Sequence, residues 1–263
     1  MFSQAQYEAV IREIEAGLKT FEGQLAQVIP TANSATSHWY VPPPVAQAFK
    51  WIAEETVKVG EAILDWFLDL LKGAVAPIFM FVDAWRWLDI KGKLNGISTD
   101  LTTQNLVVDE SDWSGRARDS YLAAAAAQSA AAGRVGSIAG TTSGNLLICA
   151  GAGLAFYIVL AGVLAKLIAA LAVSIAGMGS GIFTAPGIAL FLEEAGVNTA
   201  IIVAAVSTLA AFLAAQANAM IALHGDAVDP TSFPNGVWPN SNTGQYNDAT
   251  VKDGDADWSL KRP

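Results

Sequence analysis

One segment of this chain carries almost no charge, and it constrains the fold more than any other feature. Residues 145–223 form a 79-residue stretch with three charged side chains, Lys166, Glu193 and Glu194. Within it, residues 146–178 contain one charge and residues 197–223 contain none. Each run is longer than the ~20 apolar residues that a helix needs to cross a bilayer. We therefore expect residues 145–223 to form an apolar helical hairpin.

The sequence leaves open what covers these apolar helices. One alternative is a membrane that the hairpin enters and leaves on the same side. The other is burial in a soluble bundle or a homo-oligomer, because Ala and Gly dominate both runs and the first run would be ~50 Å long against a hydrocarbon core of ~30 Å. In a membrane, Lys166 would be an intramembrane charge, which is costly and usually functional. It would snorkel, pair with Glu193 or Glu194, or line a water-filled pore.

Glycines recur at a spacing of four residues in and before this segment. Residues with this spacing share one helix face and let two backbones approach closely, as in the packing of membrane helices. We predict that five glycines serve helix packing or oligomerisation: Gly136, Gly140, Gly144, Gly177 and Gly181. For residues 140–144 the alternative is a flexible break in the chain.

The N-terminal part of the chain shows the heptad spacing of helices that pack lengthwise on one another. The first apolar stripe comprises Tyr7, Ile11, Ile14, Leu18, Phe21, Leu25 and Val28. We expect residues 1–30 to form one heptad helix that ends at Pro30. Residues 31–44 contain three consecutive prolines and are predicted to be an extended linker.

A second stripe follows the linker, and Pro77 is predicted to kink or break its helix. The stripe comprises Val45, Phe49, Ile52, Thr56, Val59, Ile63, Phe67 and Leu70, and it resumes with Ile90, Leu94, Ile97 and Leu101. Four tryptophans lie in the same region: Trp51, Trp66, Trp85 and Trp87. Two interpretations are open for them: they fill helix–helix contacts, or they form the aromatic belt of an interfacial helix.

The periodicity stops after residue 106 and a Trp-Ser-Gly tripeptide, residues 113–115, precedes an alanine-rich helix. Ser111 or Asp112 is a candidate N-cap for that helix, and Asp119 falls in its first turn. A glycine permits a tight turn that a side chain would obstruct. A tryptophan beside it can bury its ring over the crossing of two helices.

This arrangement resembles the WXG family of type VII (ESX) secretion substrates of actinobacteria, which are helical hairpins with a Trp-x-Gly turn. Trp113, Gly115 and Tyr121 occupy the positions of the family's turn and secretion motif. The chain is also similar to ESX secretion-associated proteins, which place a hydrophobic segment after the hairpin. The resemblance covers roughly residues 45–140, and it implies a WXG-like helical hairpin over residues 45–144.

The chain departs from the family in one respect. The family's secretion signal is a Tyr followed four residues later by Asp or Glu, but Tyr121, Tyr157 and Tyr246 are followed at that distance by Ala125, Ala161 and Thr250. The resemblance implies that a partner would supply the signal, either a second WXG-like protein or a secretion chaperone.

The composition argues against several other classes of protein. The net charge is −9 with no basic patch, which disfavours nucleic-acid binding. One cysteine, Cys149, rules out an internal disulfide framework, and two histidines are too few for a histidine-based metal site. The sequence contains no Gly-x-Ser-x-Gly, phosphate-binding or dinucleotide loop, so we expect no enzyme, cofactor or catalytic residue.

Residues 224–263 are polar and without helical period, and we expect an extended or disordered tail. Asp253, Asp255 and Asp257 alternate like the start of a calcium loop, but Trp258 stands where that loop needs its turn glycine. We therefore predict no metal site there.

The expected fold is all-α: an elongated helical hairpin or bundle with a Trp-x-Gly turn, then an apolar helical hairpin and an irregular tail. The leading hypothesis is a secreted or cell-envelope ESX secretion-associated protein, without a Sec signal peptide, that self-assembles and contacts membrane. Two alternatives are a pore-forming, membrane-depolarising effector and a resident integral membrane protein.

Overall fold

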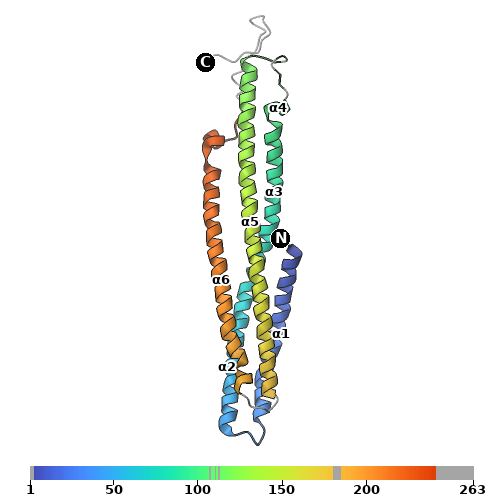
Figure 1. Cartoon of the computed structure of the whole chain (residues 1–263), viewed down its shortest axis with the longest axis vertical. Helices are drawn as coiled ribbons and strands as arrows, with labels where there is room; N and C mark the ends of the chain where they lie inside the picture. The colour runs from blue at the N-terminus through green and yellow to red at the C-terminus, as the bar shows by residue number, and fades with distance from the viewer. Residues whose placement is uncertain (1–2, 107, 110, 112, 180–184, 241–263) are drawn as a thin grey trace. The chain divides into compact units, whose positions relative to one another are not determined.

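The computed structural model describes residues 3–106, 108–109, 111, 113–179 and 185–240. All regular structure in these residues is helical, which confirms the predicted all-α class. The elements are α1 (Gln4–Thr36), α2 (Pro43–Leu71), α3 (Ala76–Asp100), α4 (Thr103–Leu106), α5 (Arg116–Gly179), α6 (Ala185–Val228) and the 3₁₀ turns η1 (Pro230–Ser232) and η2 (Pro234–Gly236) (Figure 1).

The chain divides into two compact units. The first unit comprises residues 1–81 and 147–215, and the second comprises residues 82–146 and 216–263. The first unit therefore contains α1, α2, the later part of α5 and the earlier part of α6. The second unit contains most of α3, the earlier part of α5 and the end of α6.

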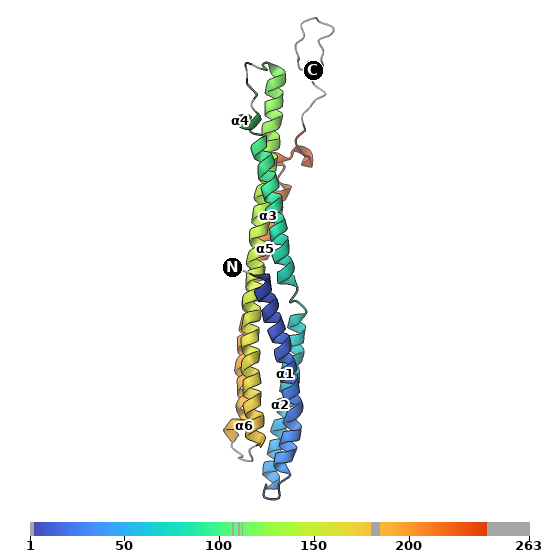
Figure 2. The ribbon, with the colours of Figure 1, turned by 90° about the vertical axis from the view of Figure 1, so that its right-hand side faces the viewer.

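In the first unit, α1 packs along α2 through the predicted heptad stripe (Figure 2). Six of the seven predicted α1 positions are buried, from Tyr7 to Val28. The prediction that the helix ends at Pro30 is wrong, since α1 continues to Thr36 with Ala32 and Ala35 buried in the same register. Pro30 itself is exposed. The free energy gained by burying Ala32 and Ala35 offsets the cost of the hydrogen bond that a proline removes from a helix.

The predicted linker is shorter than expected. Residues 31–36 belong to α1, and α2 begins with Pro43 and Pro44 after Pro42 as its N-cap, so the connection is only residues 37–42. Proline is favoured in the first turn of a helix because its fixed φ suits the helix and no N–H partner is lost.

The buried face of α2 is rotated slightly from the predicted stripe. Small residues take two of its positions: Ala53 and Gly60 are buried, whereas Ile52 and Val59 are half-buried. A Cβ atom on Gly60 would overlap the Leu25 side chain of α1. A backbone surface at these positions lets α1 and α2 approach closely.

One face of α5 completes the core of the first unit. Its fully buried residues include Leu160, Leu164, Leu167 and Leu171. The Tyr7 hydroxyl donates to the Ala74 carbonyl at 2.7 Å and the Tyr157 hydroxyl donates to the Leu70 carbonyl at 2.8 Å. These hydrogen bonds lie at and just beyond the C-terminal end of α2, where the Leu70 carbonyl also accepts from the Gly73 amide at 3.2 Å. Burial raises the pKa of Tyr7, so its hydroxyl stays protonated.

The predicted break at Pro77 is confirmed. Helix α2 ends at Leu71, and Pro77 is the second residue of α3. The Pro77 ring lies against the backbone of Gly153 on α5, where a Cβ atom would stand 2.5 Å from the Pro77 Cγ.

The second unit uses small residues where the first uses large ones. Helices α3 and α5 run antiparallel in it, because Ser98 bonds Ser129 whereas the Ser143 hydroxyl donates to the Ala84 carbonyl at 2.8 Å. The α5 side of this contact repeats with heptad spacing: Ser129, Gly133, Gly136, Gly140 and Ser143. The prediction of a buried apolar stripe on α3 is wrong here, since Ile90 and Ile97 are exposed.

The predicted tail is structured at its start. Helix α6 extends to Val228, and the 3₁₀ turns η1 and η2 follow it. Within the second unit the Gln128 side-chain amide donates to the Pro239 carbonyl at 2.8 Å. The rings of Phe233 and Trp238 pack with centroids 6.0 Å apart. Residues 224–228 are therefore helical, contrary to the expectation.

The contact between Gly153 and Pro77 generates a stability prediction. Gly153→Ala should lower the free energy of unfolding by about 1–3 kcal/mol, because the rigid proline ring cannot yield to the added methyl group. Gly151→Ala is the matched control: its Cβ would meet nothing within 4 Å, so it should be neutral or stabilise by about 0.5–1 kcal/mol. Chemical denaturation measures both, and equal effects of the two variants would contradict the contact.

Candidate functional site

The most distinctive surface of the chain is an apolar one on α5 and α6. These two helices are long and apolar enough to cross a membrane. In the most hydrophobic 18-residue stretch of each helix, 39% of the residues are buried in α5 and 6% in α6. Helix α6 thus leaves more of its apolar residues at least partly exposed than α5 does, and the two candidate spans are compatible with association with a membrane.

The exposed large apolar residues of α5 and α6 in the first unit define what we call the α5–α6 apolar surface. They comprise Ile148, Ile158, Val159 and Val173 on α5 with Val197, Ile201, Val203 and Leu213 on α6. A groove of about 360 Å³ lies between the two helices in this region. It is lined by Ala152, Ala155, Phe156, Val159, Ala205, Thr208, Leu209 and Phe212. Its one hydroxyl, on Thr208, already donates to the Ala204 carbonyl at 2.8 Å, so the groove suits an apolar occupant.

The opposite side of the first unit is polar. Helix α1 covers α5 with its buried stripe and turns charged residues outward: Glu8, Arg12, Glu13, Glu15, Lys19 and Glu22 are exposed or partly so. Charges on that side are incompatible with a bilayer that surrounds all four helices. In this arrangement the α5–α6 apolar surface is available to lipid or to another protein.

Lys166 lies on the exposed side of α5 in the first unit. None of the ion pairs among the described residues joins it to Glu193 or Glu194. The Glu194 carboxylate instead accepts from the Asn198 amide at 3.1 Å. Lys166 is therefore a single cation on a helix face that is otherwise apolar.

The Trp-Ser-Gly tripeptide lies directly before α5. Gly115 has a φ of +98°, a conformation that L side chains rarely adopt, and its carbonyl accepts the Asp119 amide at 3.2 Å as α5 begins. A Cβ atom there would meet nothing within 4 Å. The backbone angle of this turn is therefore what requires glycine, and not a neighbouring residue that a Cβ atom would meet.

The environment of the Trp113 ring differs from the predicted one. Its side chain is 37% exposed and does not bury its ring over a helix crossing. It packs on Tyr121, with ring centroids 5.6 Å apart. Of the two candidate caps, Ser111 donates its amide to the Asp109 carboxylate, and Asp112 lies outside the described residues. Trp113, Gly115 and Tyr121 thus form one partly exposed cluster at the start of α5.

The five predicted packing glycines have different environments. A Cβ atom on Gly136 would lie 2.6 Å from Asn95, and one on Gly140 would lie 3.1 Å from the Lys91 side chain, so both face α3 within the chain. Gly144 faces open space. Gly177 is half-buried, and Gly181 lies outside the described residues.

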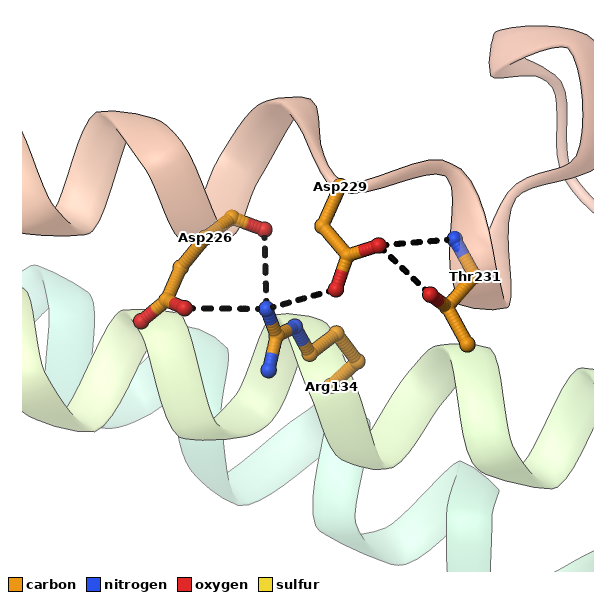
Figure 3. A network of polar contacts seen from close by, with 4 residues as sticks. All are labelled: Arg134, Asp226, Asp229 and Thr231. Atoms are coloured by element: carbon orange, nitrogen blue, oxygen red, sulfur yellow. Dashed lines mark hydrogen bonds and ion pairs between the residues drawn. The ribbon is translucent and has the colours of Figure 1, made fainter.

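A charged cluster in the second unit was not predicted (Figure 3). The Arg134 guanidinium on α5 contacts the Asp226 carboxylate at 3.0 Å and the Asp229 carboxylate at 3.3 Å, and it also donates to the Asp226 carbonyl. Asp229 in turn accepts from the backbone amide and the hydroxyl of Thr231. This Arg134 cluster ties the end of α6 to α5. The only sequence signal for it was an arginine isolated in an alanine- and glycine-rich stretch.

The part of the chain that the structure describes contains no group of three or more His, Cys, Asp or Glu residues that could hold a metal ion. Cys149 is half-buried within α5. Asp253, Asp255, Asp257 and Trp258, which were weighed as a calcium loop, lie outside the described residues. Comparisons with models of protein families, with curated proteins and with solved structures gave no match.

The Arg134 cluster generates a second prediction. Arg134→Gln removes both ion pairs, so the backbone amides near the end of α6, residues 216–228, should exchange with solvent at least several-fold faster. Arg86→Gln, which breaks an i,i+3 pair with Asp83 on the surface of α3, is the matched control. Hydrogen exchange read by mass spectrometry compares the two. Unchanged exchange in the Arg134 variant would mean that apolar packing alone holds this end of α6.

Proposed function

We propose that this chain is a type VII (ESX) secretion-associated protein that reaches the cell envelope or the exterior, self-assembles through helical faces and contacts membrane. The observation that carries the proposal is the Trp113–Gly115 tripeptide. It stands directly before a long small-residue helix, with Gly115 at positive φ and Trp113 partly exposed against Tyr121. A partly exposed motif is available for recognition by a secretion machinery, whereas a fully buried one is not.

The face of α3 that points away from α5 supports the proposal of a partner. Ile90 and Ile97 are seven residues apart and exposed by 39% and 43%. This is the spacing of one heptad, so both side chains lie on one helix face. A second copy of the chain or a second WXG-like protein would cover them, and such a partner would also supply the Tyr-x-x-x-Asp/Glu signal that the sequence lacks.

The α5–α6 apolar surface supports the proposed contact with membrane. Monomeric soluble proteins rarely leave large contiguous apolar patches exposed, and patches of this kind mark sites that contact protein or membrane. In the most hydrophobic 18-residue stretch of α6, 6% of the residues are buried, so the described part of the chain covers this stretch only in part.

Secretion tests the proposal in an actinobacterial host with an active type VII system. Trp113→Ala and Gly115→Ala should each reduce the amount of protein in the culture filtrate at least tenfold while the cell-associated amount is maintained. Trp51→Ala and Gly144→Ala are matched controls, because Trp51 is an exposed tryptophan on α2 and Gly144 is a helical glycine that faces open space.

The outcomes are distinct for each alternative. Full secretion of both motif variants would remove the main support for the proposal. Complete retention of the wild-type chain in the cell membrane, with none in the filtrate of unlysed cells, would favour a resident integral membrane protein.

A second candidate function is pore formation by α5 and α6. The observation that favours it is Lys166, an unpaired cation on an exposed, otherwise apolar helix face. A pore requires that wild-type protein release dye from vesicles and that Lys166→Ala reduce the release severalfold, since the charge would face the water-filled lumen. No release at a high protein-to-lipid ratio would exclude this function.

A further inference from the structure

The α1–α2 connection forms a tip at one end of the first unit. The Val41 amide donates to the His38 carbonyl at 3.0 Å, which closes a four-residue turn with Trp39 and Tyr40 at its two central positions. The Trp39 side chain is 95% exposed and Tyr40 is 53% exposed. The rings of His38 and Tyr40 stack with centroids 5.3 Å apart, and the Trp39 ring meets Tyr40 edge-on at 6.1 Å while it stays exposed.

The tip extends beyond the end of α5. Gly179, the last residue of α5, lies against Thr31, which is five residues before the end of α1. At a rise of ~1.5 Å per residue, the last turns of α1 and the connection therefore project past α5. Both ribbon views show the connection at the extremity of this unit (Figures 1 and 2).

The tip carries no Asp, Glu, Lys or Arg side chain. These four residue types are absent from the whole of residues 23–49, and His38 is the one histidine in this stretch. The first exposed charge on α2 is Lys50, seven residues after Pro43 and so ~10 Å from the start of the helix. On α1 the nearest charge is Glu22, fourteen residues or ~21 Å before Thr36.

We propose that this tip, residues 37–42 with the adjoining ends of α1 and α2, inserts into the interfacial region of a lipid bilayer. Indole and phenol rings prefer the headgroup level, where their apolar body and polar edge are both satisfied. Interfacial elements bury ~5–10 Å into the headgroup and acyl boundary, which matches the depth available before Lys50. That depth is far short of the ~30 Å of a spanning segment, so the tip anchors and does not cross.

The chemistry of the tip also specifies the kind of lipid surface. Since the tip has no Lys or Arg, attraction to anionic lipids contributes little, and a zwitterionic surface is sufficient. The inference rests on the membrane contact of the proposed function and names the segment that makes the first contact.

Flotation with phosphatidylcholine vesicles tests the inference on the full chain. The wild type should float with the vesicles, equally well at low and high salt. Trp39→Ala with Tyr40→Ala should weaken partitioning about tenfold or more, because the double variant removes both interfacial rings. Trp51→Ala, an exposed tryptophan beside Lys50 on α2, is the matched control and should bind like the wild type.

A site-specific probe gives a second readout that does not depend on affinity. In a Cys149→Ser background, Ser37→Cys labelled with an environment-sensitive dye should shift to the blue on adding vesicles. Thr20→Cys, at an exposed position among the charges of α1, should not shift.

Each result supports or overturns the inference. If the tip variant and the Trp51 control bind vesicles equally and the dye at position 37 does not shift, the inference that the tip inserts is overturned. The proposed function is then unaffected. No binding by the wild type overturns the tip together with the proposed membrane contact. Normal secretion of the Trp113 variant with tip-dependent binding would overturn the secretion proposal alone.

Discussion

The structure depends on how the long apolar helix α5 is covered. Its 64 residues include a run from residue 135 to 179 in which Lys166 is the only charge. In the first unit, the heptad stripes of α1 and α2 and the start of α6 cover one face of α5 with large side chains. In the second unit, small residues at heptad spacing let α3 approach the backbone of α5. Both solutions leave part of the surface of α5 open.

The uncovered part of the surface of α5 bears on function, because the exposed apolar side chains of α6 enlarge it. Helix α6 adds exposed apolar side chains to those of α5 in the first unit, while α1 carries exposed charged side chains. A unit that is polar on one side and apolar on the other is suited to lie at a boundary between water and lipid. The uncharged aromatic tip provides a point of entry into such a boundary that does not require the four helices to separate.

Heptad spacing predicted the helices and most of the α1 core, because a period of 3.5 residues reports directly on which face is buried. It failed at Pro30, where the cost of one lost hydrogen bond is smaller than the gain from burying Ala32 and Ala35. It also failed on α3, because an apolar stripe does not show whether the surface that packs on it belongs to the same chain. Ile90 and Ile97 fit the period and are exposed.

The candidate sites were less predictable than the helices. Gly115 was identified from a motif, yet the reason for it, a backbone angle of +98°, is not visible in a sequence. The Arg134 cluster joins residues 92 and 95 positions apart, and no local pattern links them. The pairing of Gly153 with Pro77 is of the same kind, because a close approach of two backbones depends on the fold as a whole.

The central claim is that lipid, and not the chain itself, covers the α5–α6 apolar surface. Light scattering of the purified full chain, without detergent and after transfer to lipid nanodiscs, tests it most directly. The account predicts heterogeneous association without detergent and, in nanodiscs, a uniform lipid-bound particle. A uniform detergent-free particle that takes up no added lipid would contradict the account, because the apolar helices would then bury one another.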